Sequence, residues 1–189
     1  MSDFPRGVRL RRYIAFLRAI NVGGRTVKMD HLRAIFAEMG FGGVETFIAS
    51  GNVIFESDNS DSDALALRIE RRLKDALGFA VETFLRPPAE VARIAEYQPF
   101  GSLAEGDPGH TLSVTFMKAP LGGEAQQRLA TLQSPTDEFH CQGLEIYWLC
   151  RGRISESKAG AQLGRLLGTR GTMRNITTVR KLAAKYHVP

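Results

Sequence analysis

The order of strand and helix patterns between residues 13 and 86 constrains the fold more than any other feature of the sequence. Residues 13–20 form an apolar run typical of a buried strand, and the turn-forming Asn21 to Gly24 follow it. Residues 28–39 place apolar side chains at helical spacing and end at Gly40, a typical helix C-cap. Residues 44–49 and 53–56 are strand-like and are joined by a short Gly/Asn turn, which predicts a hairpin.

A second helix and a fourth strand complete this pattern. The apolar residues from Leu65 to Leu77 recur at helical spacing until Gly78, and residues 81–85 alternate before Pro87 and Pro88. The resulting order is βαββαβ. It predicts a ferredoxin-like subdomain, in which two helices cover one face of a four-stranded antiparallel sheet.

The second half repeats much of this pattern after a Gly- and Pro-rich stretch at residues 98–110. We therefore predict two subdomains, residues 1–98 with a linker helix and residues 99–189. The second half is predicted to contain a strand at 112–117, a helix at 123–132, a hairpin at 138–142 and 145–149 turning at Gly143, and helices at 159–167 and 176–186. The fold class is α+β, with an N-terminal ferredoxin-like subdomain and a C-terminal βαββα-type subdomain that ends in a further helix.

Composition argues for a cytoplasmic globular protein. Hydrophobic residues make up 43% of the chain, enough for a sizeable core, yet no stretch is long and apolar enough to span a membrane. The basic start of the sequence is followed by no apolar segment of a signal peptide. The two cysteines, Cys141 and Cys150, lie in the predicted hairpin and are expected to be reduced thiols.

Positive charge is concentrated at the C-terminal end. The formal net charge is +5, whereas residues 151–189 contain nine Lys or Arg against Glu156 alone. Such an asymmetry is typical of a surface that binds a phosphate group or a polyanion. A charged surface that serves only solubility has the same signature.

One candidate site arises where two predicted turns meet. The first and third strands of a ferredoxin-like sheet are antiparallel neighbours, so the end of the first lies beside the turn before the third. The residues brought together are Arg18, Asn21, Gly23, Gly24, Ser50, Gly51 and Asn52. Glycine amides and polar side chains together can hold an anion. The same residue types also stabilise tight turns without any ligand.

A second candidate site lies in the polar segment 168–181. Thr172 or Asn175 is suited to cap the last helix, and arginines flank this predicted helix start. Free N–H groups and cations at such a position suit a phosphate, so we assign Arg174, Asn175 and Thr178 to the site. A capped surface helix without a ligand is the alternative. The glycine spacing of a P-loop or a Rossmann fold is absent.

No residue pattern specifies a reaction. His140 and Cys141 are neighbours on a predicted strand and therefore point to opposite faces, which argues against a nucleophile pair. The four histidines are scattered without metal-ligand spacing, so we predict no metal and no cofactor. The chain is compatible with both an enzyme and a binding protein.

Three motifs in this order resemble a known family. They are Leu17-Arg18-Ala19-Ile20-Asn21-Val22-Gly23-Gly24, Ser50-Gly51-Asn52-Val53-Ile54-Phe55, and Thr172-Met173-Arg174-Asn175 continuing to Thr178-Val179-Arg180-Lys181-Leu182. The chain is similar to bacterial DUF1697 proteins, a family of unknown function, over residues 13–185. The resemblance implies two α+β subdomains, the first ferredoxin-like, and it implies no activity.

The sequence departs from the family pattern at two places. The family usually has Gly where Ala19 stands, and Trp followed by Asn where Ile176 and Thr177 stand. If the family's Trp stacks on a ligand, Ile176 does not replace that contact. If the Trp only packs, Ile is a tolerable substitute.

Our leading hypothesis from the sequence is binding of a small phosphate-bearing or nucleotide-like ligand in a cleft between the subdomains. Arg18 and Arg174 would pair with the charge, the glycine amides would donate hydrogen bonds, and the asparagines would orient the ligand.

Two alternatives stay open. The basic C-terminal segment is compatible with nucleic-acid binding, for which Tyr13, Phe16 and Phe55 would have to be exposed on the sheet. Phe16 and Phe55 instead fit a core. The other alternative is an interaction protein whose polar motifs are purely structural. Ligand identity and oligomeric state do not follow from the sequence.

Overall fold

The computed structural model describes residues 10–49, 51–102, 106–168 and 170–187. Its contacts divide the chain into two compact units. Unit 1 extends to Val91 and also takes in the segment from Tyr186, whereas unit 2 is Ala92–Lys185. The division falls inside helix α3 (Pro88–Glu96), and the boundary predicted after residue 98 lies just beyond this helix.

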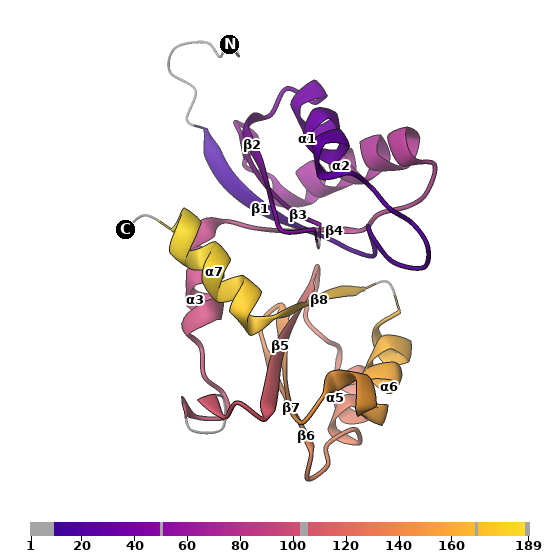
Figure 1. The fold of residues 1–189 in the computed structure, drawn as a ribbon, viewed down its shortest axis with the longest axis vertical. Helices are drawn as coiled ribbons and strands as arrows, with labels where there is room; N and C mark the ends of the chain where they lie inside the picture. Colours follow the sequence, from indigo (N-terminus) through magenta and orange to yellow (C-terminus); the bar gives the residue numbers. More distant parts are fainter. Residues whose placement is uncertain (1–9, 50, 103–105, 169, 188–189) are drawn as a thin grey trace. The chain divides into compact units, whose positions relative to one another are not determined.

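Unit 1 is a four-stranded antiparallel sheet with two helices on one face (Figure 1). Its elements are β1 (Arg11–Leu17), α1 (Met29–Glu38), β2 (Gly42–Phe47), β3 (Asn52–Ser57), α2 (Ser62–Leu77) and β4 (Thr83–Arg86). The strand order is β2-β3-β1-β4. The predicted βαββαβ arrangement is therefore confirmed.

Helix α2 illustrates how the sequence forms these elements. Asp61 caps its N-terminus, because the side chain accepts hydrogen bonds from the backbone N–H groups of Asp63 and Ala64. Gly78 ends the helix in a left-handed conformation with φ 77°. The apolar face between these ends packs onto the sheet. The fully buried side chains on that face are Leu65, Ile69 and Leu73.

Unit 2 contains a second four-stranded antiparallel sheet. Its elements after α3 are β5 (His110–Met117), α5 (Gly123–Ala130), β6 (Asp137–Gln142), β7 (Glu145–Arg151), the 3₁₀ turn η1 (Ile154–Glu156), α6 (Lys158–Leu167), β8 (Gly171–Asn175) and α7 (Ile176–Tyr186). The strand order is β6-β7-β5-β8. The α+β fold class with two subdomains is confirmed.

Strand β8 is a feature that the sequence prediction lacked. Its residues were interpreted as the polar start of the last helix, but they pair antiparallel with β5, with Arg174 opposite Val114. Thr172 and Arg174 are buried while Met173 between them is exposed, which is the alternation of an edge strand. With β8 included, both units have the order βαββαβ, and their strand orders correspond position by position. The chain is an internal structural repeat.

A polar network around Asp137 lies in the core of unit 2. One carboxylate oxygen, Oδ1, accepts hydrogen bonds from Trp148 Nε1 at 2.9 Å and Ser157 Oγ at 2.8 Å. The other, Oδ2, accepts from Thr136 Oγ1 at 2.9 Å and Ser134 Oγ at 3.2 Å. Burial alone would raise the pKa of Asp137, but these four hydrogen bonds outweigh it and hold the pKa below its ordinary value.

Two further findings concern membrane-spanning helices and the cysteine thiols. No helix in the described ranges is both long and apolar enough to cross a membrane. Cys141 and Cys150 are free, and burial raises the pKa of each thiol. A raised pKa lowers the fraction of thiolate, so neither sulfur is activated as a nucleophile.

Candidate functional site

The structure brings together the two turns that the sequence predicted to meet in unit 1. The backbone N–H of Leu17 donates to Gly51 O at 2.8 Å. The side chain of Asn21 connects the two turns, since its Nδ2 donates to Ala49 O at 2.9 Å and its Oδ1 accepts from Val27 N at 2.7 Å. These bonds hold the turns to each other.

The other predicted residues of this cluster also contact the protein itself. Asn52 is fully buried and donates from Nδ2 to Phe47 O at 3.0 Å. Gly23 and Gly24 have positive φ angles, as tight turns require. Arg18 forms an ion pair with Glu82 at 3.8 Å. Ser50 lies outside the described residues.

Ala19 occupies a backbone conformation that favours glycine. Its φ of 53° lies in the left-handed region, where a Cβ atom costs about 1–2 kcal/mol. We expect Ala19→Gly to raise the free energy of unfolding by about 0.5–1 kcal/mol, because relief of this strain exceeds the added entropy of the unfolded chain. Urea denaturation of the two proteins measures the difference. An unchanged or lower stability of the variant would contradict the expected relief of strain.

The C-terminal candidates lie in unit 2 on β8 and α7. Arg174 is only 8% exposed, and its Nη1 donates to Thr172 Oγ1 and Met173 O, both at 2.9 Å. Burial lowers the pKa of Arg174 to about 10. Asn175 Oδ1 accepts from Thr177 N at 2.8 Å, so Asn175 caps α7 as expected. Thr178 is partly buried on α7.

Arg174 has a counterpart in unit 1. Arg86 lies at the end of β4 and is paired with Ile14 of β1. Arg174 lies in the same way on β8 and is paired with Val114 of β5. Each arginine is two residues before the helix that follows its strand. Arg86 is 4% exposed and pairs with Glu90, four positions later, at 3.2 Å. A buried arginine on the last strand is thus part of the repeated architecture. The repeat accounts for the placement of Arg174 without reference to a ligand.

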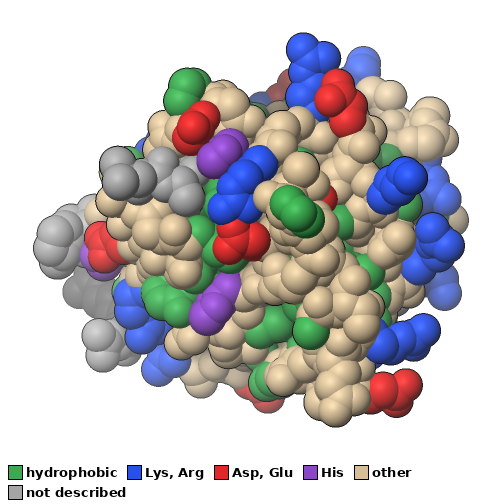
Figure 2. Space-filling model, turned by 90° about the horizontal axis from the view of Figure 1, so that it is seen from below, with side chains coloured by type: hydrophobic (Ala, Val, Ile, Leu, Met, Phe, Trp, Pro, Cys, Tyr) green, Lys and Arg blue, Asp and Glu red, His purple; other side chains and the backbone are tan. Residues whose placement is uncertain are grey.

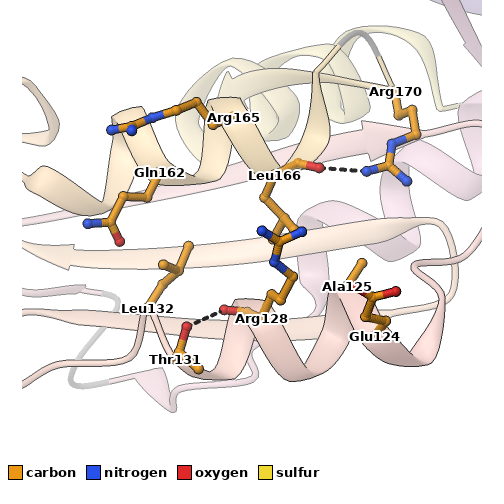
Figure 3. Close-up of a pocket in the computed structure, with 9 residues that line it drawn as sticks. All are labelled: Glu124, Ala125, Arg128, Thr131, Leu132, Gln162, Arg165, Leu166 and Arg170. Atoms are coloured by element: carbon orange, nitrogen blue, oxygen red, sulfur yellow. Dashed lines mark hydrogen bonds between the residues drawn. The ribbon is translucent and has the colours of Figure 1, made fainter.

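A pocket of about 450 Å³ lies between α5 and α6 in unit 2 (Figure 3). Its lining residues are Glu124, Ala125, Arg128, Thr131, Leu132, Gln162, Arg165, Leu166 and Arg170. Arg128 reaches from α5 toward α6, with Arg165 on one side of it and Arg170 on the other (Figure 3). Figure 2 shows several Lys and Arg side chains along its right-hand edge.

The three pocket arginines form no ion pair with any carboxylate in the part of the chain that the structure describes. Arg170 donates to the carbonyls of Leu167 and Leu166, at 3.2 and 2.5 Å, which fixes its guanidinium at the end of α6. Glu124 lines the same pocket but pairs with none of the arginines. Its place in the first turn of α5 is favourable for the helix dipole.

Unit 1 provides an internal comparison for this pocket. Helices α1 and α2 correspond to α5 and α6, and there an arginine between the helices is neutralised. Arg72 of α2 pairs with Glu38 of α1, and Arg68 donates to Met39 O at 2.6 Å. In unit 2 the arginines of the corresponding gap form no such ion pair within the described residues, although Glu124 lies at the pocket wall. Uncompensated arginines of this kind can bind an external anion.

The sequence prediction included Arg170 only as a flanking charge and missed Arg128 and Arg165. The sequence does indicate two polar helix faces here. Arg128 follows Glu124 by four positions and Arg165 follows Gln162 by three, so the residues of each pair lie on the same face of their helix. Finding the pocket from sequence also requires knowing that α5 and α6 lie side by side, which the βαββαβ topology of unit 2 implies once β8 is recognised.

The fold and this pocket define a class of protein, a repeat of two ferredoxin-like units with an arginine-lined pocket in the second. The chain belongs to the DUF1697 family of proteins of unknown function, whose model matches residues 10–147.

Similarity to a solved structure supports the fold. A conserved bacterial protein from Streptococcus pneumoniae is 24% identical, with a TM-score of 0.72, over 95% of this chain and 100% of that one. A comparison with proteins of curated description gives no match.

Proposed function

We propose that the chain binds a small phosphate-bearing ligand in the pocket between α5 and α6. The observation that carries this proposal is the presence of three arginines around one pocket, none paired with a carboxylate of the described chain. The ligand class is the one expected from the sequence, but the proposed residues are Arg128, Arg165 and Arg170. The turn around Asn21 is less suited to bind this ligand, because the Asn21 side chain already forms hydrogen bonds with the protein's own backbone.

The chemistry of guanidinium supports a phosphate ligand. Its planar fork of N–H donors matches two phosphate oxygens, and such charge-assisted hydrogen bonds are about twice as strong as neutral ones. The volume of about 450 Å³ falls in the range of small-molecule sites, which is roughly 300–1,000 Å³. Arg170 is already fixed by two backbone carbonyls, so little side-chain entropy is lost when it binds.

Burial of the sheet aromatics favours a small ligand over RNA on the sheet of unit 1. An RNA-recognition sheet stacks bases on exposed aromatic rings. Tyr13, Phe16 and Phe55 are 5%, 0% and 0% exposed, so none offers a ring face to a base.

Calorimetric titration tests the proposal with wild-type protein, Arg128→Ala and Arg72→Ala. The titrants are orthophosphate, inorganic diphosphate, a hexose phosphate and ADP. We expect at least one to bind the wild type and to lose about tenfold or more in affinity in Arg128→Ala. Affinity should also fall as salt rises from about 50 to about 200 mM, because the pocket is exposed to screening.

Arg72→Ala is the matched control, because it removes an arginine from the corresponding helix pair of unit 1, where Glu38 neutralises it. Its affinity should equal that of the wild type. The proposal fails if no titrant binds, or if Arg128→Ala and Arg72→Ala bind as tightly as each other.

A further inference from the structure

The shape and lining of the arginine pocket narrow the ligand class, on the assumption that the proposed function is correct. The three guanidinium groups do not converge on one point. Figure 3 shows Arg165 and Arg170 on opposite sides of Arg128, with Arg165 extended along α6, where its Nε donates to Ala161 O at 3.4 Å. A second phosphate group brings a second set of acceptor oxygens. A ligand with two phosphate groups can therefore engage more of these separated arginines than one orthophosphate can.

The lining residues offer no aromatic ring on which a nucleobase could stack, and their guanidinium groups are the ones proposed to bind phosphate. Proteins hold bases by stacking them on aromatic rings or on guanidinium planes, with hydrogen bonds to the base edges. None of the described residues that line this pocket is aromatic; its apolar part is Ala125, Leu132 and Leu166. The nearby rings of Phe139 and Trp148 stack on each other in the core, 7% and 1% exposed.

The remaining polar residues suit a short hydroxylated core. Gln162 is exposed on α6 and presents both a donor and an acceptor to the pocket. Thr131 Oγ1 donates to Arg128 O at 2.7 Å, which leaves its oxygen able to accept from a ligand hydroxyl. The carboxylate of Glu124 at the pocket wall offers further acceptor oxygens to a ligand hydroxyl.

We infer that the α5/α6 pocket selects a compact ligand with two phosphate groups and no aromatic base. Inorganic diphosphate and a sugar bisphosphate share this chemistry. Arg165 and Arg170 hold the two phosphates, Arg128 contacts both from between them, and Gln162 contacts the core when the core carries hydroxyls.

The test is a calorimetric competition on the full chain with orthophosphate, inorganic diphosphate, a hexose bisphosphate, ADP and a short oligonucleotide, at about 50 mM salt. We expect diphosphate or the bisphosphate to bind at least about tenfold tighter than orthophosphate, because a second phosphate engages a second arginine. ADP should bind no tighter than diphosphate. Gln162→Ala should weaken the bisphosphate alone if a sugar core is recognised, and should leave diphosphate unchanged.

The outcomes separate this inference from the proposed function. If ADP or the oligonucleotide binds about tenfold tighter than diphosphate and Arg128→Ala abolishes that binding, the pocket binds phosphates but the inferred ligand class is wrong. Equal affinities for orthophosphate and diphosphate also overturn the inference. If no probe binds, or if Arg128→Ala has no effect, the proposed function and the inference both fail.

Discussion

Asp137→Ala is expected to lower the free energy of unfolding by about 3–5 kcal/mol. The carboxylate accepts hydrogen bonds from Trp148 and three hydroxyl groups, and the alanine leaves the buried indole N–H of Trp148 without an acceptor. Trp148 is the only tryptophan in the chain, so its fluorescence during urea denaturation reports on unit 2 directly.

Asp137→Asn and Glu138→Ala keep this prediction testable if the alanine variant does not fold. The amide retains an oxygen for Trp148 and Ser157, so Asp137→Asn should lose only about 1–2 kcal/mol. Glu138 is adjacent, but its ion pair with Arg151 is on the surface, and Glu138→Ala should cost less than about 1 kcal/mol. Equal losses in Asp137→Ala and Glu138→Ala would refute the role of the network.

The same network predicts a pH dependence of stability. The pKa of Asp137 is lower in the folded protein than in the unfolded chain, where it is about 3.9. The stabilisation by the ionised carboxylate is therefore complete above the unfolded pKa and is lost as the pH falls through the folded pKa. Between about pH 5 and 3, the free energy of unfolding should fall less steeply in Asp137→Asn than in the wild type. Parallel curves for the two proteins would contradict this assignment.

Gly51→Ala is expected to lower the free energy of unfolding by about 2–4 kcal/mol, the second large effect. A Cβ atom at this position would lie 2.5 Å from Ile20 Cγ2 and 3.3 Å from Leu17 Cβ. Both neighbours are in the core and have no room to move, and the φ of 75° adds backbone strain. Thermal unfolding followed by far-ultraviolet circular dichroism measures the loss.

Gly78→Ala separates the steric effect from the backbone effect. Gly78 has nearly the same φ, 77°, but a Cβ atom there would meet nothing within 4 Å. Only the cost of the left-handed conformation applies, about 1–2 kcal/mol. If the two variants lost the same stability, the close approach of Gly51 to Ile20 would have no energetic consequence.

Most of the fold was predictable because strong periodic patterns coincide with capping residues. Helix α2 has buried leucines and an isoleucine at helical spacing between Asp61 and Gly78, so local and tertiary preferences agree. Strand β8 was not predictable in the same way. It has five residues, most of them polar or glycine, and forms a strand because β5 offers an unpaired edge.

The pocket was harder to predict because its residues are individually ordinary. Arg128 and Arg165 on exposed helix faces have the pattern of solvated surface charges. What distinguishes them is that neither forms an ion pair with a carboxylate in the described structure, whereas the pair of Arg72 with Glu38 in the other unit shows the usual arrangement. The Asn21 and Asn52 turns, by contrast, were located correctly from the topology, whereas their ligand contacts stay a prediction.

The pairing of β5 with β8 has a consequence for how the chain folds as it leaves the ribosome. All four strands of the first sheet have been made by Arg86, so that sheet can be completed early. The second sheet waits for residues 171–175, and synthesis of residues 118–175 takes about 3–12 s at roughly 5–20 residues per second. Until residues 171–175 are made, the edge of β5 that pairs with β8 has unpaired N–H and C=O groups, the kind of edge to which other nascent chains add.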